Sequence, residues 1–233
     1  MKALNPWLDL LGESPFCLEC DWEALSRHNK SLDPHSPYLY ELHKVLPEPF
    51  IGRVDKSPVV ILQLNPGYDE NIDPQSHSDP FFRNTLMSNL SHSIDKCPFY
   101  YLDPSYKEHP GSIWWQSKTK RLQKLVGAEL LSQNLAVVEW FPYKSTKFKD
   151  GCLVPSQEYG FSLVKRAIDR GALIIVSRSH RRWLKSVPEL YSYTNVLTLS
   201  SSQNITLSEN NLLIRGAKDP SAWEFLVSRL RNE

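Results

Sequence analysis

The sequence predicts an α/β protein, a three-layer α/β/α sandwich around a short, mainly parallel four-stranded sheet. Two observations predict it. Four short apolar runs, rich in β-branched residues, alternate with longer segments of helical spacing. Strands buried on both faces read as continuous apolar runs of this kind, because helices cover both sides of the sheet. The runs are residues 59–64, 135–140, 173–177 and 196–200.

The segments between these runs predict the covering helices. Helical spacing covers residues 80–90 and 114–131, and then residues 157–170, where Gly171 is placed to end the helix. The last helix follows Asp219, which can cap it. Before the first strand, residues 1–55 are rich in Pro, Trp and Tyr, and we expect helices at 22–30 and 36–45. We therefore predict a single domain, residues 1–233, with an N-terminal helical cap over 1–55.

Composition sets limits on the function. The chain has 233 residues, 41% of them hydrophobic, a net charge of +1 and a pI near 7.7. This balance does not by itself indicate a nucleic-acid partner, so a basic binding face would have to be local. We find no signal-like segment and no apolar run long enough for a bilayer, and we expect a cytoplasmic monomer without a membrane partner.

The four cysteines favour free thiols. Cys17 and Cys20 form a Cys-x-x-Cys pair that could open a metal or iron–sulfur site, but Cys97 and Cys152 are scattered and form no second pair. We therefore expect neither a metal nor another cofactor, and no disulfide in a reducing compartment.

Polar residues follow each predicted strand. In an open parallel sheet, ligands bind at the carboxyl ends of the strands, so these exits are where chemistry is expected. The first exit is Asn65-Pro66-Gly67, in which proline fixes the turn, glycine adds no side chain and the asparagine amide is presented rigidly. A plain turn explains the same three residues.

The other exits carry charge and hydroxyls. Glu139 lies within the second apolar run, where a carboxylate must face solvent or have a specific partner. Lys144 and Lys147 follow this run and are candidate contacts to a nucleic-acid backbone. At the third and fourth exits we single out possible phosphate contacts. These are Arg178, His180, Arg181 and Arg182, then Ser201, Ser202 and Asn204.

The order of these exits resembles the uracil-DNA glycosylase superfamily, most closely its mismatch-specific and single-strand-selective branches. The likeness runs from Val59 to the end of the chain and is tight only at Asn-Pro-Gly; Gln63 stands where those branches have a leading glycine. The resemblance implies that Asn65 positions the hydrolytic water. It also implies that Gly67 leaves the pyrimidine 5-position open, where uracil-specific members carry a tyrosine.

The resemblance further implies a pocket for a flipped base. Phe81 or Phe82 would stack on it, Tyr68 would line it, and Glu139 falls where other branches carry an asparagine that reads uracil. Because a carboxylate accepts from the amine of cytosine, we expect a modified cytosine as the substrate. In the last motif Ile205 or Leu207 would insert as a wedge into the base stack. The usual histidine is missing, so the reaction would be slow unless another group, such as His180, stabilises the departing base.

We therefore predict a monofunctional DNA glycosylase that leaves an abasic site, in repair or in defence against phage with modified DNA. Two alternatives stay open. One is an enzyme acting on free nucleosides or nucleotides, and the other is a catalytically silent nucleic-acid-binding module.

Overall fold

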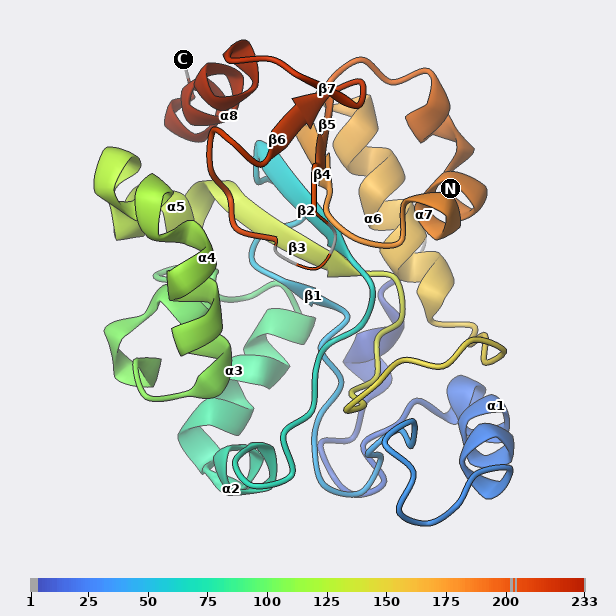
Figure 1. The fold of residues 1–233 in the computed structure, drawn as a ribbon. Coiled ribbons are helices and arrows are strands. Elements are labelled where there is room, and N and C mark those ends of the chain that lie inside the picture. Colours follow the sequence, from blue (N-terminus) through green and yellow to red (C-terminus); the bar gives the residue numbers. More distant parts are fainter. Residues whose placement is uncertain (1–3, 202, 204, 233) are drawn as a thin grey trace. The chain divides into compact units, whose positions relative to one another are not determined.

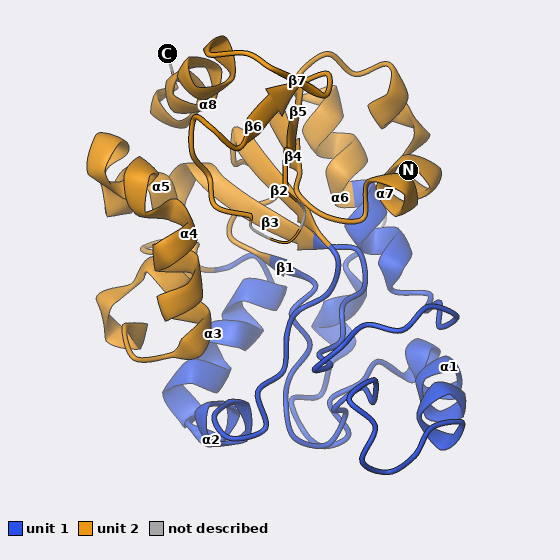
Figure 2. Ribbon diagram, viewed as in Figure 1, with its two compact units in different colours: residues 1–50, 64–93, 139–162 blue, residues 51–63, 94–138, 163–233 orange. Residues whose placement is uncertain are grey.

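The structure of the protein is a computed structural model that describes residues 4–201, 203 and 205–232. The chain forms two compact units, each assembled from three separate stretches of sequence (Figure 2). Unit 1 comprises residues 1–50, 64–93 and 139–162, and unit 2 comprises residues 51–63, 94–138 and 163–233. Whether the chain is a single domain stays a prediction, and the two units are described separately below.

A seven-stranded sheet, mixed and mostly parallel, dominates the fold (Figure 1). Its order is β1-β3-β2-β4-β5-β6-β7. The strands β2, β4 and β5 pair in parallel, while β6 and β7 form an antiparallel hairpin on β5. The strands are β1 (Phe50–Ile51), β2 (Val59–Gln63), β3 (Leu135–Glu139), β4 (Leu173–Val176), β5 (Val196–Leu199), β6 (Leu212–Ile214) and β7 (Ala217–Lys218).

The four apolar runs are confirmed as strands β2, β3, β4 and β5. The sheet, however, has seven strands where four were expected. The additional strands β1, β6 and β7 have two or three residues each, too short to give a periodic signal in the sequence. Every residue of β2, β3 and β4 is buried, which is why these strands read as continuous apolar runs.

Helices lie on both sides of the sheet in unit 2 (Figure 2). The helices α4 (Pro110–Val126), α5 (Ala128–Asn134) and α8 (Ser221–Arg231) lie on one side. On the other side lie α7 (His180–Ser186) and the unit 2 part of α6 (Gln157–Asp169). The short 3-10 helices η2 (Tyr100–Leu102), η3 (Pro104–Tyr106) and η4 (Pro188–Tyr191) join these elements. The mixed α/β class is therefore confirmed.

Two helix predictions need correction. The expected helix over 114–131 is two helices, because Gly127 adopts a positive φ of 82° and ends α4 before α5 begins. The expected helix over 36–45 is absent, since that stretch consists of turns and irregular backbone. Its backbone groups are engaged elsewhere: the N–H of Glu41 donates to the carbonyl of Lys144. Tertiary pairing therefore overrides the local helical pattern.

Unit 1 is held by an irregular ladder of extended segments. Its helices are η1 (Pro6–Asp9), α1 (Glu19–Lys30), α2 (Asp73–Ser78) and α3 (Pro80–Leu90). Between them, residues 139–147 bond to residues 64–67 on one side, through Phe141 N–H to the Leu64 carbonyl at 2.8 Å. On the other side the same segment pairs with residues 37–49, where Glu48 N–H donates to the Pro142 carbonyl at 3.1 Å. The exits of β2 and β3 are therefore fixed against each other.

Candidate functional site

The Asn65 turn lies at the switch point of the sheet. The crossover from β2 to β3 leads to one side of β2, and the next leads from β3 to β4 on its other side. In open α/β sheets ligands bind at the carboxyl end of a strand flanked in this way. Asn65, Pro66 and Gly67 follow directly on β2, as predicted from the sequence.

The side chain of Asn65 is held in one orientation. Its Nδ2 donates to the Ser145 hydroxyl at 3.0 Å and to the Pro66 carbonyl at 3.1 Å. A carbonyl oxygen only accepts hydrogen bonds, so the nitrogen must face Pro66. The Oδ1 atom has no partner among the residues that the structure describes, and it is therefore free to accept from a ligand or a water.

Below this turn, Lys144 forms a buried ion pair. Its ammonium lies 2.7 Å from Glu48 Oε1 and 3.8 Å from Asp73 Oδ1, and the side chains of all three residues are at most 7% exposed. It also donates to the Gly67 carbonyl at 3.2 Å. Burial lowers the pKa of Lys144, but the carboxylates of Glu48, Asp73 and Glu139 more than offset this, and its pKa is raised above the ordinary value. Lys144 is therefore charged at neutral pH and ties Gly67 in place.

A histidine completes this cluster. His77 Nδ1 accepts from the Leu46 N–H at 2.9 Å, and its Nε2 lies 3.9 Å from Glu48 Oε1. Since Nδ1 acts as the acceptor, the ring proton of neutral His77 is on Nε2, facing the glutamate. We call Glu48, Asp73, His77, Glu139 and Lys144 the ion-pair cluster.

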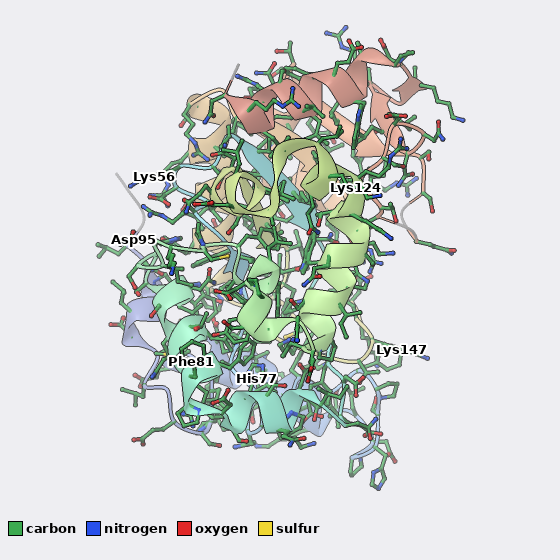
Figure 3. The ribbon with its side chains drawn as sticks, turned by 90° about the vertical axis from the view of Figure 1, so that its left-hand side faces the viewer. Lys56, His77, Phe81, Asp95, Lys124 and Lys147 are labelled. Carbon is green, nitrogen blue, oxygen red and sulfur yellow. The ribbon has the colours of Figure 1, made fainter. Side chains whose placement is uncertain are left out.

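The aromatic residues predicted for the base pocket lie in different environments. Phe82 is 2% exposed and packs edge-on against His77, with centroids 5.4 Å apart. Phe81, on α3, is 62% exposed and is labelled in Figure 3. Tyr68 is 8% exposed, and the Lys44 ammonium lies 5.7 Å from its ring centroid. Of the two phenylalanines, Phe81 is the accessible one.

Gly67 lies at an open position. A Cβ atom built on Gly67 would meet no other atom within 4 Å. The glycine is therefore not needed to avoid a clash, and the space beside the turn is free for a ligand substituent.

The other residues predicted to contact DNA differ in their exposure to solvent. Lys144 is buried in its ion pair, and Ile205 and Leu207 are each 1% exposed, which leaves all three little surface to offer to DNA. Lys147 is exposed and labelled in Figure 3, and Arg181 and His180 are also exposed.

The third and fourth exits lie in unit 2. Arg178 and His180 line a cavity there, and Arg181 does not. The Ser201 N–H donates to Asn211 Oδ1 at 3.2 Å. The predicted contacts Ser202 and Asn204 lie outside the described residues.

Some residues of the ion-pair cluster, of the Asn65 turn and of the cavity in unit 2 were not singled out from the sequence. They are Glu48, Asp73, His77, Ser145 and Arg215. Ser145 follows Lys144 directly and could have been noticed as a hydroxyl at the second strand exit. Nothing in the sequence distinguishes Glu48 from the other acids of the chain.

Three of the four cysteines surround a buried carboxylate in unit 1. Asp21 is 0% exposed and accepts from the Tyr143 hydroxyl at 2.7 Å. Burial, together with the negative charge of Asp21, raises the pKa of Cys17, of Cys20 and of Cys152 to about 11 each. Within the described residues, no three His, Cys, Asp or Glu side chains are grouped so as to hold a metal ion. All four cysteines are free, and Cys97 contacts the Ser132 hydroxyl in unit 2.

No described helix has both the length and the apolar character needed to cross a bilayer.

The ion-pair cluster gives a stability prediction. Lys144→Met leaves buried carboxylates without their cation, and we expect it to lower the free energy of unfolding by about 3–5 kcal/mol. Adding Glu48→Gln to this variant removes one of those charges and should recover part of the loss. Urea denaturation measures both. Lys147→Met is the matched control on the same segment, with an expected change within about 0.5 kcal/mol. Equal stabilities of the Lys144 and Lys147 variants would contradict the assignment.

The thiols give a second prediction. At pH 8 a pKa near 11 leaves far less thiolate than the ordinary value, so we expect iodoacetamide to label Cys20 at least tenfold more slowly in the folded protein than in urea. Cys20 is exposed, whereas Cys17 is half-buried and Cys152 is buried, so restricted access slows the labelling of Cys20 least. The rate should rise as the pH approaches 11. Peptide mass spectrometry follows the reaction, and equal rates in the folded and unfolded chains would overturn the prediction.

Comparison with known proteins adds no relative: no family model, no curated protein and no solved structure matches this chain. The function therefore has to be inferred from the geometry of the clusters described above.

Proposed function

We propose that the protein is a monofunctional DNA glycosylase that hydrolyses the N-glycosidic bond of a flipped base. One observation carries the proposal: Asn65 Nδ2 is committed to Ser145 and Pro66, which leaves Oδ1 as a fixed acceptor at the switch point of the sheet. The Oδ1 atom can accept a hydrogen bond from one O–H group of a water. A lone pair of that water oxygen can then point toward the sugar. The likeness of the Asn-Pro-Gly turn to the uracil-DNA glycosylase superfamily supports the same role.

The proposed reaction needs no cofactor. The oxygen of the water held by Asn65 bonds to C1′, the bond from C1′ to the base breaks, and its electron pair leaves with the base. The proton lost by the water is balanced by the proton that the departing base takes up. An amide does not accept this proton, so Asn65 acts by orienting the water.

A modified cytosine is the substrate that we propose. Glu139 is 9% exposed, and its charge contributes to the raised pKa of Lys144. An ionised carboxylate at this position acts only as a hydrogen-bond acceptor. An acceptor pairs with the exocyclic amine of cytosine and is repelled by O4 of uracil. The open space at Gly67 suits a substituent at the 5-position.

Exposed groups supply the remaining roles in this proposal. Phe81 stacks on the flipped base, and the exposed His180, Arg181 and Lys147 contact the backbone. Lys144 serves as a structural cation and not as a phosphate contact, because it is buried in its ion pair. Ile205, at 1% exposure, takes no part as a wedge.

The test of the reaction is base release. The protein is incubated with DNA that contains uracil, 5-hydroxymethylcytosine or its glucosylated form, and released base is measured by mass spectrometry. We expect release by the wild type and a loss of about 100-fold or more in Asn65→Ala. If no base is released while DNA is still bound, the enzymatic proposal fails.

Ser145 gives a sharper test of the orientation of Asn65. Without its hydroxyl the amide can rotate, so we expect Ser145→Ala to lower kcat by about tenfold with KM little changed. Ser145→Thr keeps a hydroxyl at this position and should restore most of the rate. A rate that is equally low in both variants would indicate a packing role for Ser145 and not a positioning role.

The substrate preference is tested at Glu139. Glu139→Gln replaces an acceptor by an amide that can also donate to O4, so we expect the ratio of uracil to modified-cytosine release to rise by about tenfold or more. Asn65→Ala, which should release neither base, is the negative control. An unchanged ratio would remove Glu139 from base recognition and leave the hydrolytic proposal intact.

A further inference from the structure

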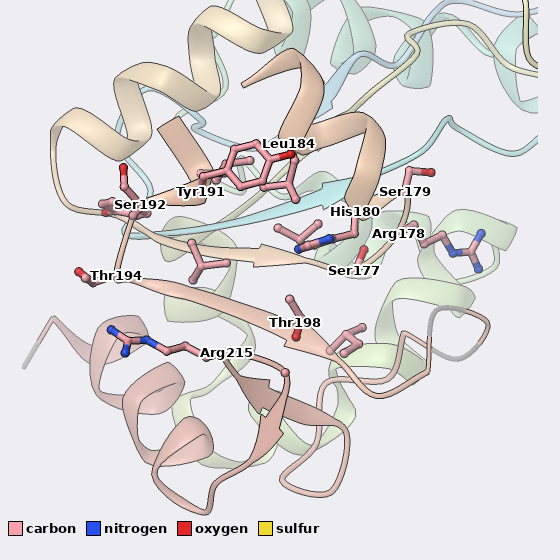
Figure 4. A pocket seen from close by; sticks show the side chains of 16 residues that line it. Ser177, Arg178, Ser179, His180, Leu184, Tyr191, Ser192, Thr194, Thr198 and Arg215 are labelled. Atoms are coloured by element: carbon pink, nitrogen blue, oxygen red, sulfur yellow. The ribbon is translucent and has the colours of Figure 1, made fainter. Parts of the chain in front are cut away.

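Unit 2 contains a cavity on one face of its sheet. Its volume is about 600 Å³, and its walls come from α7, η4, β5 and the turn between β6 and β7 (Figure 4). Cavities of roughly 300–1,000 Å³ hold small organic ligands. This one is therefore of suitable size for a single nucleotide.

The walls combine an apolar surface with free hydroxyls. Leu184 and Tyr191 lie on one side and Thr198 on the other, with the His180 ring pointing between them (Figure 4). The hydroxyls of Thr198 and Ser179 have no hydrogen-bond partner within the described part of the chain. A flat apolar body that carries hydrogen-bonding edges would fit such walls.

The wall that α7 forms is anchored to the sheet. Trp183 is 0% exposed and its indole N–H donates to the Gln63 carbonyl at 2.7 Å. The residues of α7 that line the cavity are therefore held in place before any ligand binds, which lowers the entropic cost of binding.

The charge of the lining is entirely positive. Arg178 and Arg215 lie at opposite sides of the cavity, and the described lining residues include no aspartate or glutamate (Figure 4). Neither arginine has an acidic partner among the residues that the structure describes, and the buried Nε of Arg178 lacks a hydrogen-bond partner there. In a chain with a net charge of only +1, this concentration of cations favours an anionic ligand.

The backbone at Arg215 is unfavourable for an arginine. Arg215 and Gly216 form the two-residue turn between β6 and β7, with φ of 50° and 78°. Hairpin turns with two positive φ angles prefer Asn, Asp or Gly at the first position. An arginine there is disfavoured, which points to a role for its guanidinium.

We propose that this cavity binds a nucleotide, with the phosphate against Arg215 and the base between Leu184 and Thr198. Asn65, Ser145 and Glu139 are not among the residues that line this cavity. It is therefore expected to bind whether or not Asn65 supports catalysis, so nucleotide binding and base release are tested independently.

The decisive variant is Arg215→Asn, because asparagine is favoured in this turn and should leave the melting temperature unchanged or raise it. Binding of dCMP and AMP is measured by isothermal titration calorimetry. We expect saturable binding of at least one by the wild type, and at least tenfold weaker binding of that nucleotide by Arg215→Asn. Its nucleoside, which lacks the phosphate, should bind the wild type at least tenfold more weakly.

Two controls separate this site from general charge effects. Lys185→Gln removes one positive charge from an exposed position on α7 that does not line the cavity, and it should bind like the wild type. Asn65→Ala should also keep its affinity. The proposal is overturned if the wild type binds neither nucleotide, or if Arg215→Asn binds as tightly as the wild type.

A competition experiment identifies the source of the nucleotide. A single-stranded oligodeoxynucleotide is added to the complex with the nucleotide that binds. Displacement by the oligonucleotide indicates that the cavity takes a nucleotide of a DNA strand, and retention of the complex indicates a free nucleotide. Either result supports the site, provided that Arg215→Asn has lost the affinity.

Discussion

The buried charge of Lys144 is the constraint on which unit 1 depends. An ammonium this deeply buried is stable only beside carboxylates, and Glu48 and Asp73 meet this need from two other segments of the chain. The lysine thereby joins the exit of β3 to the segment before β1 and to α2. Its third contact, the Gly67 carbonyl, joins the Asn-Pro-Gly turn to the same charge.

This connection explains why an asparagine in a turn can be held rigidly. Pro66 limits the backbone, Lys144 holds the carbonyl of Gly67, and Ser145, the next residue along, accepts from the Asn65 amide. Adjacent residues of one extended segment thus hold the turn by its backbone and by its side chain. A mutation at the ion pair would therefore change the position of Asn65 indirectly, through Gly67 and Ser145. For that reason stability and activity have to be measured together in any variant of this cluster.

The core strands could be predicted from the sequence, whereas the interactions of the charged residues could not. Strands β2, β3 and β4 could be predicted because their burial on both faces leaves a continuous apolar run. In β5 only Leu197 is buried, and its apolar and β-branched composition was enough to predict it. The helix expected over 36–45 was wrong because backbone bonds to residues 139–147 outweigh a local pattern. The partner of Lys144 and the role of Arg215 depend on contacts between distant segments, which periodicity does not encode.

The cavity of unit 2 follows from an incomplete helical layer. β4 is buried along its whole length, whereas in β5 only Leu197 is buried and its neighbours Val196 and Thr198 line the cavity. Since successive side chains alternate between faces, Val196 and Thr198 share the side of the sheet that α7 covers only in part. That helix has seven residues and ends before the adjoining η4, so β5 keeps an open face. Uncharged polar side chains would be enough to keep such a face hydrated. The cavity is lined instead by Arg215, in a backbone conformation that disfavours arginine, and a bound anion explains this residue better than solubility does.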